Sequence, residues 1–215
     1  VAGTQVVLDV GDGDDAPASQ CAAQINLTAD GTFGSDGGTL TATCRYLTQN
    51  IEMLRVGDLV VSRSETDRDG ENVLRRIEEV FVRRVQSLQI LTVRSSTGEI
   101  QTIHTTQVHP VYINARGWVD AAHIHVGDQI LEPTGGLSTV LDSRFENHRD
   151  GILVYNFRVA GTHTYFVREQ GSTAEPVWVH NSYAEEGVAP KQGELFDDID
   201  RQVGRYDRAS QYQIG

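Results

Sequence analysis

The sequence lacks several features that would narrow its class at once. Among its 215 residues there is one methionine, and no apolar run reaches the roughly 18 residues of a membrane-spanning helix. The only cysteines, Cys21 and Cys44, could form one disulfide, but a single pair leaves the compartment open. Basic residues number 18 against 30 acidic ones, and the resulting net charge of −12 argues against general binding to nucleic acid or to an anionic membrane.

The acidity is distributed unevenly along the chain. Residues 8–50 carry a net charge of −5 and residues 182–215 one of −3, so the middle of the chain is nearly balanced. This pattern is typical of a globular core with solvated appendages. The chain does not begin with Met and shows no signal peptide, so we expect a piece of a longer polypeptide.

What the sequence does contain is a succession of strand-like segments. Short apolar or alternating runs are separated by turns rich in Gly, Asp and Asn, which predicts an all-β fold. The clearest run is 154–167, where alternation, an Ala160-Gly161 turn and a second β-branched and aromatic run predict a hairpin. We also expect a strand at 1–8, a final one at 177–181, and two separate strands at 73–84 and 87–95 joined by a brief turn.

One motif occurs twice. Arg55-Val-Gly-Asp-Leu-Val-Val61 returns as His125-Val-Gly-Asp-Gln-Ile-Leu131, and each copy follows an apolar half-turn and precedes a loop and two strands. The shared downstream order favours duplication over chance recurrence of a common tripeptide. A duplicated β unit buries the apolar face of each half against the other around a pseudo-twofold axis, so residues from both halves should meet at the seam.

Two segments do not follow the strand pattern. We interpret 9–47 as an acidic insertion of low order; its loop at 9–17 lacks the glutamate that completes a calcium loop, so a solvated loop is favoured over a calcium site. Beyond residue 181, apolar residues recur at helical spacing and predict an amphipathic helix at 194–208. That helix could open a downstream domain or pack on the β domain.

Three motifs carry residues suited to chemistry. Thr106-Gln-Val-His109 places a hydroxyl and an imidazole on one turn, and His163 lies at the entry to a strand. In His180-Asn181-Ser182, the Asn side chain could close on its own carbonyl and cut the following peptide bond, if the leaving amine is protonated. Each motif taken alone is also compatible with an ordinary turn or core residue. The remaining histidines show no recognised metal spacing, so no metal or other cofactor is expected.

Taken together, these blocks resemble the Hint (hedgehog/intein) superfamily, and most closely bacterial intein-like and polymorphic-toxin Hint domains. The resemblance covers roughly residues 1–182 and rests on blocks that occur in one order. They are Val1-Ala-Gly-Thr-Gln-Val6, 51–60, Thr106-x-x-His109-Pro110, Gly117-Trp118, Val126-Gly-Asp128, Val154-Tyr-Asn-Phe157, His163-Thr-Tyr-Phe166 and Val179-His-Asn181.

The resemblance implies an all-β horseshoe with pseudo-twofold symmetry and self-cleavage or splicing of the host chain. Carried over by position, Thr106 and His109 would strain and polarise the upstream peptide. His163 and His180 would assist the C-terminal step, Asn181 would cyclise, and Ser182 would be the acceptor in true splicing.

Two departures from the family pattern affect this expectation. The family's opening nucleophile would stand two residues before Val1, outside this sequence; a competing alignment, which places 38–43 at the opening, is less well matched. Asn156 stands where many inteins carry an Asp, and a neutral amide cannot act as a carboxylate base. Splicing is therefore less favoured than cleavage.

We expect a Hint domain at 1–181 and an extension at 182–215. The hypothesis is single-turnover processing that releases the segment after Asn181, with the flanking polypeptide as its partner and a monomer as the working form. The alternative is a decayed scaffold that holds or shields that segment without cutting it. The compartment is not determined by the sequence; a secreted or cell-surface bacterial protein is one option.

Overall fold

The computed structural model describes residues 1–10 and 46–181, and these residues belong to one compact unit. They form an antiparallel β sheet with two short 3-10 turns, which confirms the all-β prediction. The predicted helix at 194–208, both cysteines, the acidic loop beyond residue 10 and Ser182 lie outside the described residues. In the described part of the chain, no helix is long and apolar enough to cross a membrane.

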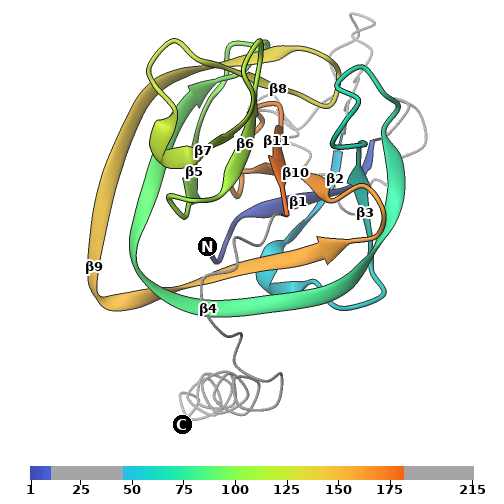
Figure 1. Ribbon diagram of the computed structural model, residues 1–215, viewed down its shortest axis with the longest axis horizontal. Coiled ribbons are helices and arrows are strands. Elements are labelled where there is room, and N and C mark those ends of the chain that lie inside the picture. The colour runs from blue at the N-terminus through green and yellow to red at the C-terminus, as the bar shows by residue number, and fades with distance from the viewer. Residues whose placement is uncertain (11–45, 182–215) are drawn as a thin grey trace, which may run out of the picture. The chain divides into compact units, whose positions relative to one another are not determined.

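The strands pair in the order β2-β1-β10-β11-β6-β8-β9-β4-β3, with β5 added to β4 and β7 added to β6 (Figure 1). Their bounds are β1 (Gln5–Val10), β2 (Tyr46–Asn50), β3 (Leu59–Ser62), β4 (Val73–Arg94), β5 (Ile100–Thr105), β6 (Pro110–Ile113), β7 (Gly117–Asp120), β8 (Gln129–Leu131), β9 (Leu137–Val159), β10 (Thr164–Arg168) and β11 (Val177–His180). The 3-10 turns are η1 (Ile51–Met53) and η2 (Ala121–His123).

Two long strands, β4 and β9, pair along almost their whole length and curve together around the other strands (Figure 1). The expected turn between 84 and 87 is therefore wrong: β4 continues through it. The irregularity there is a shift of register, because Val85 pairs with Ile152 and Ser87 with Asn147. Residues 148–151 on β9 thus fall opposite the single residue Gln86 on β4, as in an enlarged bulge. A bulge and a turn have similar local sequences, and only the partner strand separates them.

The duplicated motif forms the same structure in both halves. Asp58 accepts a bond from the backbone N of Arg55 at 2.8 Å, and Asp128 accepts one from His125 at 2.9 Å. Each motif glycine then turns the chain at positive φ, +98° at Gly57 and +92° at the second copy. L-residues reach such angles only with strain, and this explains why glycine occupies both positions.

Backbone bonds beyond the motif repeat as well. The N–H of Gly57 donates to Ile77 at 2.9 Å, and that of Gly127 donates to Val140 at 2.9 Å. The start of each long strand is thereby fastened to its own motif. The internal duplication predicted from the sequence is confirmed bond by bond.

The match between the two halves also shows which strands the segment 11–45 connects. β1 pairs with β2 from Gln5 opposite Asn50, and β6 pairs with β7 from Pro110 opposite Asp120, in each case just before the 3-10 turn. The segment 11–45 is therefore the connection of the β1–β2 hairpin, where the second half has only residues 114–116. Hairpin connections tolerate such insertions because the chain leaves and re-enters the sheet at neighbouring points.

The buried side chains of the described residues form a main core, a second cluster on the other face of the central strands, and a small third cluster of Leu88, Ile90 and Val154. The main core includes residues from both halves, among them Val6, Leu54, Val60, Ile77, Leu91, Val111, Ile124, Ile130, Val140, Phe157, Tyr165 and Val179. The second is Val7, Tyr46, Val61, Leu131, Phe166 and Trp178. Strands β10 and β11 contribute to both clusters, so their register is well determined by packing on two faces.

Candidate functional site

Three chain segments meet where β10, β11 and β6 lie side by side. β10 pairs with β11 from Thr164 opposite His180, and the backbone N–H of Asn181 donates to the carbonyl of His163 at 2.9 Å. β11 pairs with β6 through Val179 opposite Val111. Extending this antiparallel register by two residues places Asn181 opposite His109. The motifs that were far apart in sequence are thus brought together at one end of these strands.

The start of the chain lies at the same site. Residues 1–4 form a turn in which the N–H of Thr4 donates to the carbonyl of Val1 at 3.2 Å, with Gly3 at φ +83°. The N–H of Gly3 donates to both carboxylate oxygens of Glu52, at 3.0 and 3.2 Å. The first peptide units are therefore held in a fixed position.

Thr106 and His109 form the turn that the sequence predicted. The N–H of His109 donates to the carbonyl of Thr106 at 3.2 Å, and the ring of His109 meets Tyr165 edge to face, 6.4 Å between ring centres. Burial is the main cause that lowers the pKa of His109 to about 3, and nearby positive charges act in the same direction. His109 is therefore neutral near pH 7, with one nitrogen able to donate and the other to accept.

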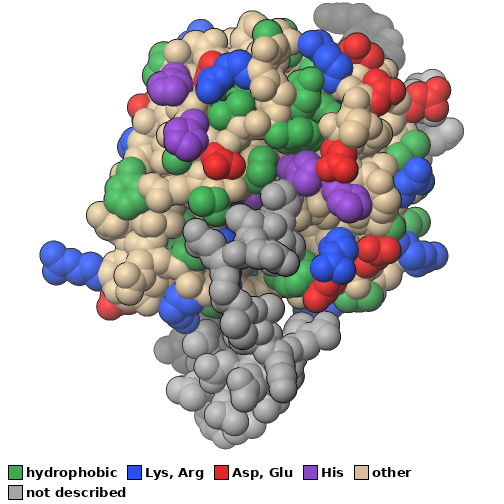
Figure 2. Space-filling model, in the orientation of Figure 1, with side chains coloured by type: hydrophobic (Ala, Val, Ile, Leu, Met, Phe, Trp, Pro, Cys, Tyr) green, Lys and Arg blue, Asp and Glu red, His purple; other side chains and the backbone are tan. Residues whose placement is uncertain are grey.

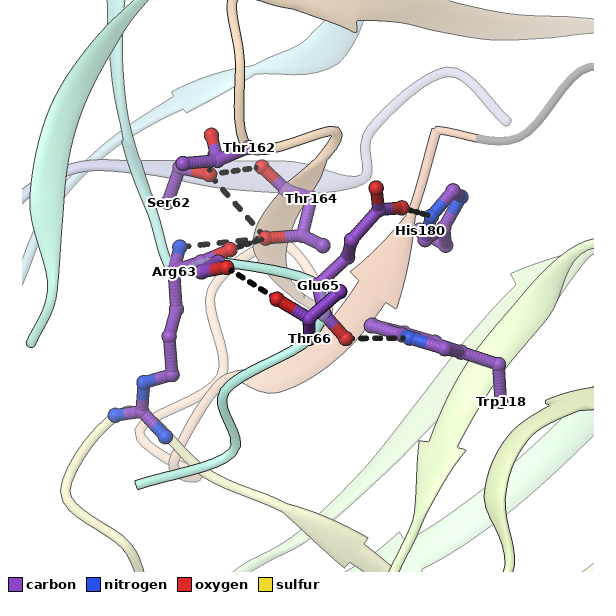
Figure 3. A network of polar contacts seen from close by, with 9 residues as sticks. Ser62, Arg63, Glu65, Thr66, Trp118, Thr162, Thr164 and His180 are labelled. Carbon is purple, nitrogen blue, oxygen red and sulfur yellow. Dashed lines mark hydrogen bonds and ion pairs between the residues drawn. The ribbon is translucent and has the colours of Figure 1, made fainter. Parts of the chain in front are cut away.

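His180 lies in a polar cluster that the sequence did not reveal (Figure 3). Its Nε2 is hydrogen-bonded to a carboxylate oxygen of Glu65, and its ring packs edge to face on Trp118, with the ring centres 4.9 Å apart. Trp118 in turn donates from Nε1 to the backbone carbonyl of Glu65 at 3.0 Å. Glu65 belongs to a charged loop between β3 and β4, and no spacing or motif links it to a histidine 115 residues later.

Asn181 is enclosed, with only 4% of its surface exposed. Its side-chain Nδ2 is buried and has no hydrogen-bond partner among the described residues, and the same holds for Nδ1 of its neighbour His180. Leaving a buried polar group unpaired costs about 1–3 kcal/mol, so such groups are uncommon in folded proteins. Two of them on consecutive residues mark this position as unusual.

His163 contributes differently from the expectation. Its backbone is in the left-handed region at φ +60°, its side chain is exposed, and the part that contacts Asn181 is its carbonyl oxygen. A positive φ in a non-glycine residue is a strained conformation that often occurs near functional positions. The structure brings Thr106, His109, His180 and Asn181 to one site together with the His163 backbone.

Asn156 lies next to this group through Tyr165. The phenol of Tyr165 donates to the Asn156 side-chain oxygen at 3.0 Å, and the same oxygen accepts from the N–H of Phe157 at 2.9 Å. Burial raises the pKa of Tyr165, so the phenol stays protonated and keeps donating. The amide oxygen of Asn156 is thus occupied in holding the aromatic ring that contacts His109.

Figure 2 shows histidine side chains beside an acidic side chain near the centre of the face it presents. Across residues 1–10 and 46–181, no group of three or more His, Cys, Asp or Glu is arranged to hold a metal ion.

Comparison with protein families matches residues 41–182 to the pretoxin Hint domain. The chain belongs to this family. Hint domains are autoprocessing domains that act in cis on flanking segments of the same polypeptide. The match spans the repeat and every site segment except the turn at 1–4, which lies before it.

The chain is also similar to solved structures. The bacterial intein-like domain from Clostridium thermocellum is 28% identical over 84% of this chain and 96% of its own, with a TM-score of 0.56. A DnaB intein from Synechocystis sp. PCC 6803 is 13% identical over 64% of this chain and 89% of its own, with a TM-score of 0.47. Curated protein sequences give no match.

Proposed function

We propose that this Hint domain cuts its own chain after Asn181 and releases the segment that begins with Ser182. The observation that carries the proposal is the state of Asn181. Its side-chain nitrogen is buried and has no hydrogen-bond partner among residues 1–10 and 46–181, while its backbone N–H is bonded to His163. An amide nitrogen that makes no hydrogen bond does not have to break one before it attacks the carbonyl carbon.

The reaction forms one bond and breaks one. Nδ2 of Asn181 attacks the carbonyl carbon of Asn181 and closes a five-membered succinimide, while the bond from that carbon to the Ser182 nitrogen breaks. Nδ2 loses a proton and the leaving amine gains one, so the step needs a group that accepts and returns a proton. The imidazole of His180, the residue before Asn181, is suited to this because its Nδ1 has no hydrogen-bond partner among the described residues.

The other site residues take supporting roles in this proposal. His109, neutral and opposite Asn181 in the extended register, can donate a hydrogen bond to the carbonyl oxygen on which charge develops. Thr106 and His109 would also act on the upstream peptide, whose nucleophile lies outside the 215 residues. His163 assists through its carbonyl, which holds Asn181, and Ser182 would be the acceptor if splicing occurs.

The test is intact mass spectrometry of the 215-residue chain during incubation at neutral pH, beside Asn181→Ala. We expect the wild type to divide between Asn181 and Ser182 and the variant to stay whole. The N-terminal product should first be one water lighter than the product of hydrolysis, because it ends in a succinimide. If both proteins remain equally uncut, the proposal is wrong.

A second candidate, a scaffold that holds the downstream segment without cutting it, is favoured by one observation. Asn156 carries a neutral amide whose oxygen already accepts two hydrogen bonds, so it offers no base to the site. This candidate expects wild type and Asn181→Ala to be equally stable in the same assay.

A further inference from the structure

A hydrogen bond to its backbone holds Glu65 beside His180. The carbonyl of Glu65 accepts from Trp118 at 3.0 Å, while its carboxylate reaches Nε2 of His180 (Figure 3). Because the ring of Trp118 also packs against His180, one aromatic side chain holds both members of the pair. The His180 side chain is 14% exposed and that of Glu65 36%, so water reaches the carboxylate more easily than the imidazole.

The loop that carries Glu65 is tied down at its base. Arg63, 5% exposed, donates to the carbonyl of Pro133 at 2.7 Å, to the carbonyl of Arg68 at 2.8 Å and to Asn72 at 3.2 Å. Its guanidinium also lies 5.5 Å from the centre of the Trp178 ring, within range of a cation–π contact. A loop fastened in this way restricts where Glu65 can go.

The strand before the loop is joined to β10 by hydroxyl groups. Ser62 Oγ lies 2.6 Å from Thr162 Oγ1 and donates to the carbonyl of Thr164 at 2.6 Å, and the hydroxyl of Thr164 bonds to the carbonyl of Arg63 (Figure 3). The loop and β10 are therefore coupled, and β10 is paired to the strand that ends in His180.

We propose that Glu65 is a positioning residue for His180. Its carboxylate accepts a hydrogen bond from the Nε2–H group of His180, and this leaves Nδ1, which has no partner among the described residues, as the nitrogen that accepts and returns the proton. The inference rests on the proposed function. Nδ1 accepts the proton from Nδ2 of Asn181 as the succinimide closes and passes it to the amine of Ser182 as that bond breaks. The carboxylate stabilises the imidazolium between these two transfers.

The groups around the His180 ring agree with these separate roles for Nε2 and Nδ1. Glu65 is the acidic neighbour from the β3–β4 loop, Trp118 on β7 is uncharged, and His109 before β6 stays neutral near pH 7. Tyr165, which contacts His109, stays protonated because burial raises its pKa. Of these groups, Glu65 supplies the negative charge in contact with His180.

The experiment measures the rate of cleavage after Asn181 in four variants of the full chain. Glu65→Gln keeps the shape but removes the charge, and we expect a loss of roughly 30-fold in rate, less than the roughly 10²–10⁴-fold of general acid–base assistance because the imidazole itself remains. Glu71→Gln makes the same change at an exposed position of the same loop and should leave the rate unchanged. His180→Gln should lose more than Glu65→Gln, and adding Glu65→Gln to it should change nothing further.

The conservative variant separates positioning from mere support of the fold. Glu65→Asp, which keeps the charge, should recover part of the rate that is lost in Glu65→Gln. A purely structural role predicts no such recovery, because Asp is shorter than Glu and changes the packing of the loop more than Gln does.

The outcomes distinguish the two levels of the proposal. If the wild type stays uncut, the proposed function fails and the role of Glu65 falls with it. If His180→Gln cuts as fast as the wild type, cleavage stands but the roles given to His180 and Glu65 are overturned. If His180→Gln slows cleavage while Glu65→Gln behaves like Glu71→Gln, cleavage stands and the inference about Glu65 is overturned. Equal melting temperatures in Glu65→Gln and the wild type would show that the rate loss is not unfolding.

Discussion

The two halves of the domain share a backbone plan and use it differently. Each begins with a four-residue turn closed by a 3.2 Å bond, Val1–Thr4 in the first half and Thr106–His109 in the second. In each, the carbonyl at the end of the turn accepts from the first residue of the 3-10 turn, Thr4 from Ile51 at 2.8 Å and His109 from Ala121 at 3.0 Å. The fourth turn position thus holds an inert side chain in one half and an imidazole in the other.

The hairpins after the repeated motif also differ between the halves, in the length of the connection and in the contacts of its carboxylate. In the second half the connection is short, and its Glu132 is fully buried, accepting from the backbone N and hydroxyl of Ser96 and from Ser138 at 2.5–2.8 Å. In the first half the connection is long and brings Glu65 to His180. One carboxylate holds the fold and the other serves the site. Duplication thus provides the frame, and the loops that diverge from it provide the function.

The largest expected effect tests this difference between the two carboxylates. Glu132→Ala removes an acceptor for three buried or half-buried donors and should lower the free energy of unfolding by about 3 kcal/mol. Glu65→Ala, at a partly exposed position, should lower it by less than about 1 kcal/mol. Urea denaturation of both variants measures this, and equal losses would contradict the distinction.

The next largest effect concerns His109, at the fourth position of the turn in the second half, and the dependence of stability on pH. Because folding lowers the pKa of His109 to about 3 from the 6.5 of a free side chain, the folded state binds fewer protons than the unfolded state between these values. Its contribution is therefore fully present above pH 6.5 and is lost as pH falls toward 3.

Comparing unfolding at about pH 7 and about pH 4.5, the wild type should lose roughly 2 kcal/mol more than His109→Gln. Thr4→Ser, the matched change in the first half, should leave the pH dependence of stability as it is in the wild type. A parallel loss in His109→Gln would mean that His109 is not buried as a neutral ring.

The smallest effect tests the frame itself. Gly57→Ala and Gly127→Ala each force an L-residue into positive φ, and the added Cβ meets nothing within 4 Å, so backbone strain is the whole cost. We expect each to destabilise the protein by about 1 kcal/mol, and by the same amount within error. Thermal unfolding measures both losses. A clearly larger loss at one position would show that the repeated motif does not contribute equally to stability in the two halves.

Local pattern was enough to predict much of the molecule. Alternating and β-branched runs indicated an all-β fold, the repeated Val-Gly-Asp motif indicated the duplication, and two short motifs supplied Thr106, His109, His180 and Asn181. These features lie within a few residues of one another in the chain, so periodicity and turn chemistry suffice to read them.

The tertiary structure decided the rest, because each remaining feature depends on a partner remote in sequence. The continuity of β4 through residue 86 depends on pairing with β9, and the assignment of Nε2 of His180 depends on a carboxylate 115 residues earlier. His163 was predicted for its ring, yet its carbonyl holds Asn181 while the ring is exposed, since φ +60° turns the side chain away. Sequence patterns report which residues alternate or repeat, whereas hydrogen bonds between distant strands decide which atoms meet.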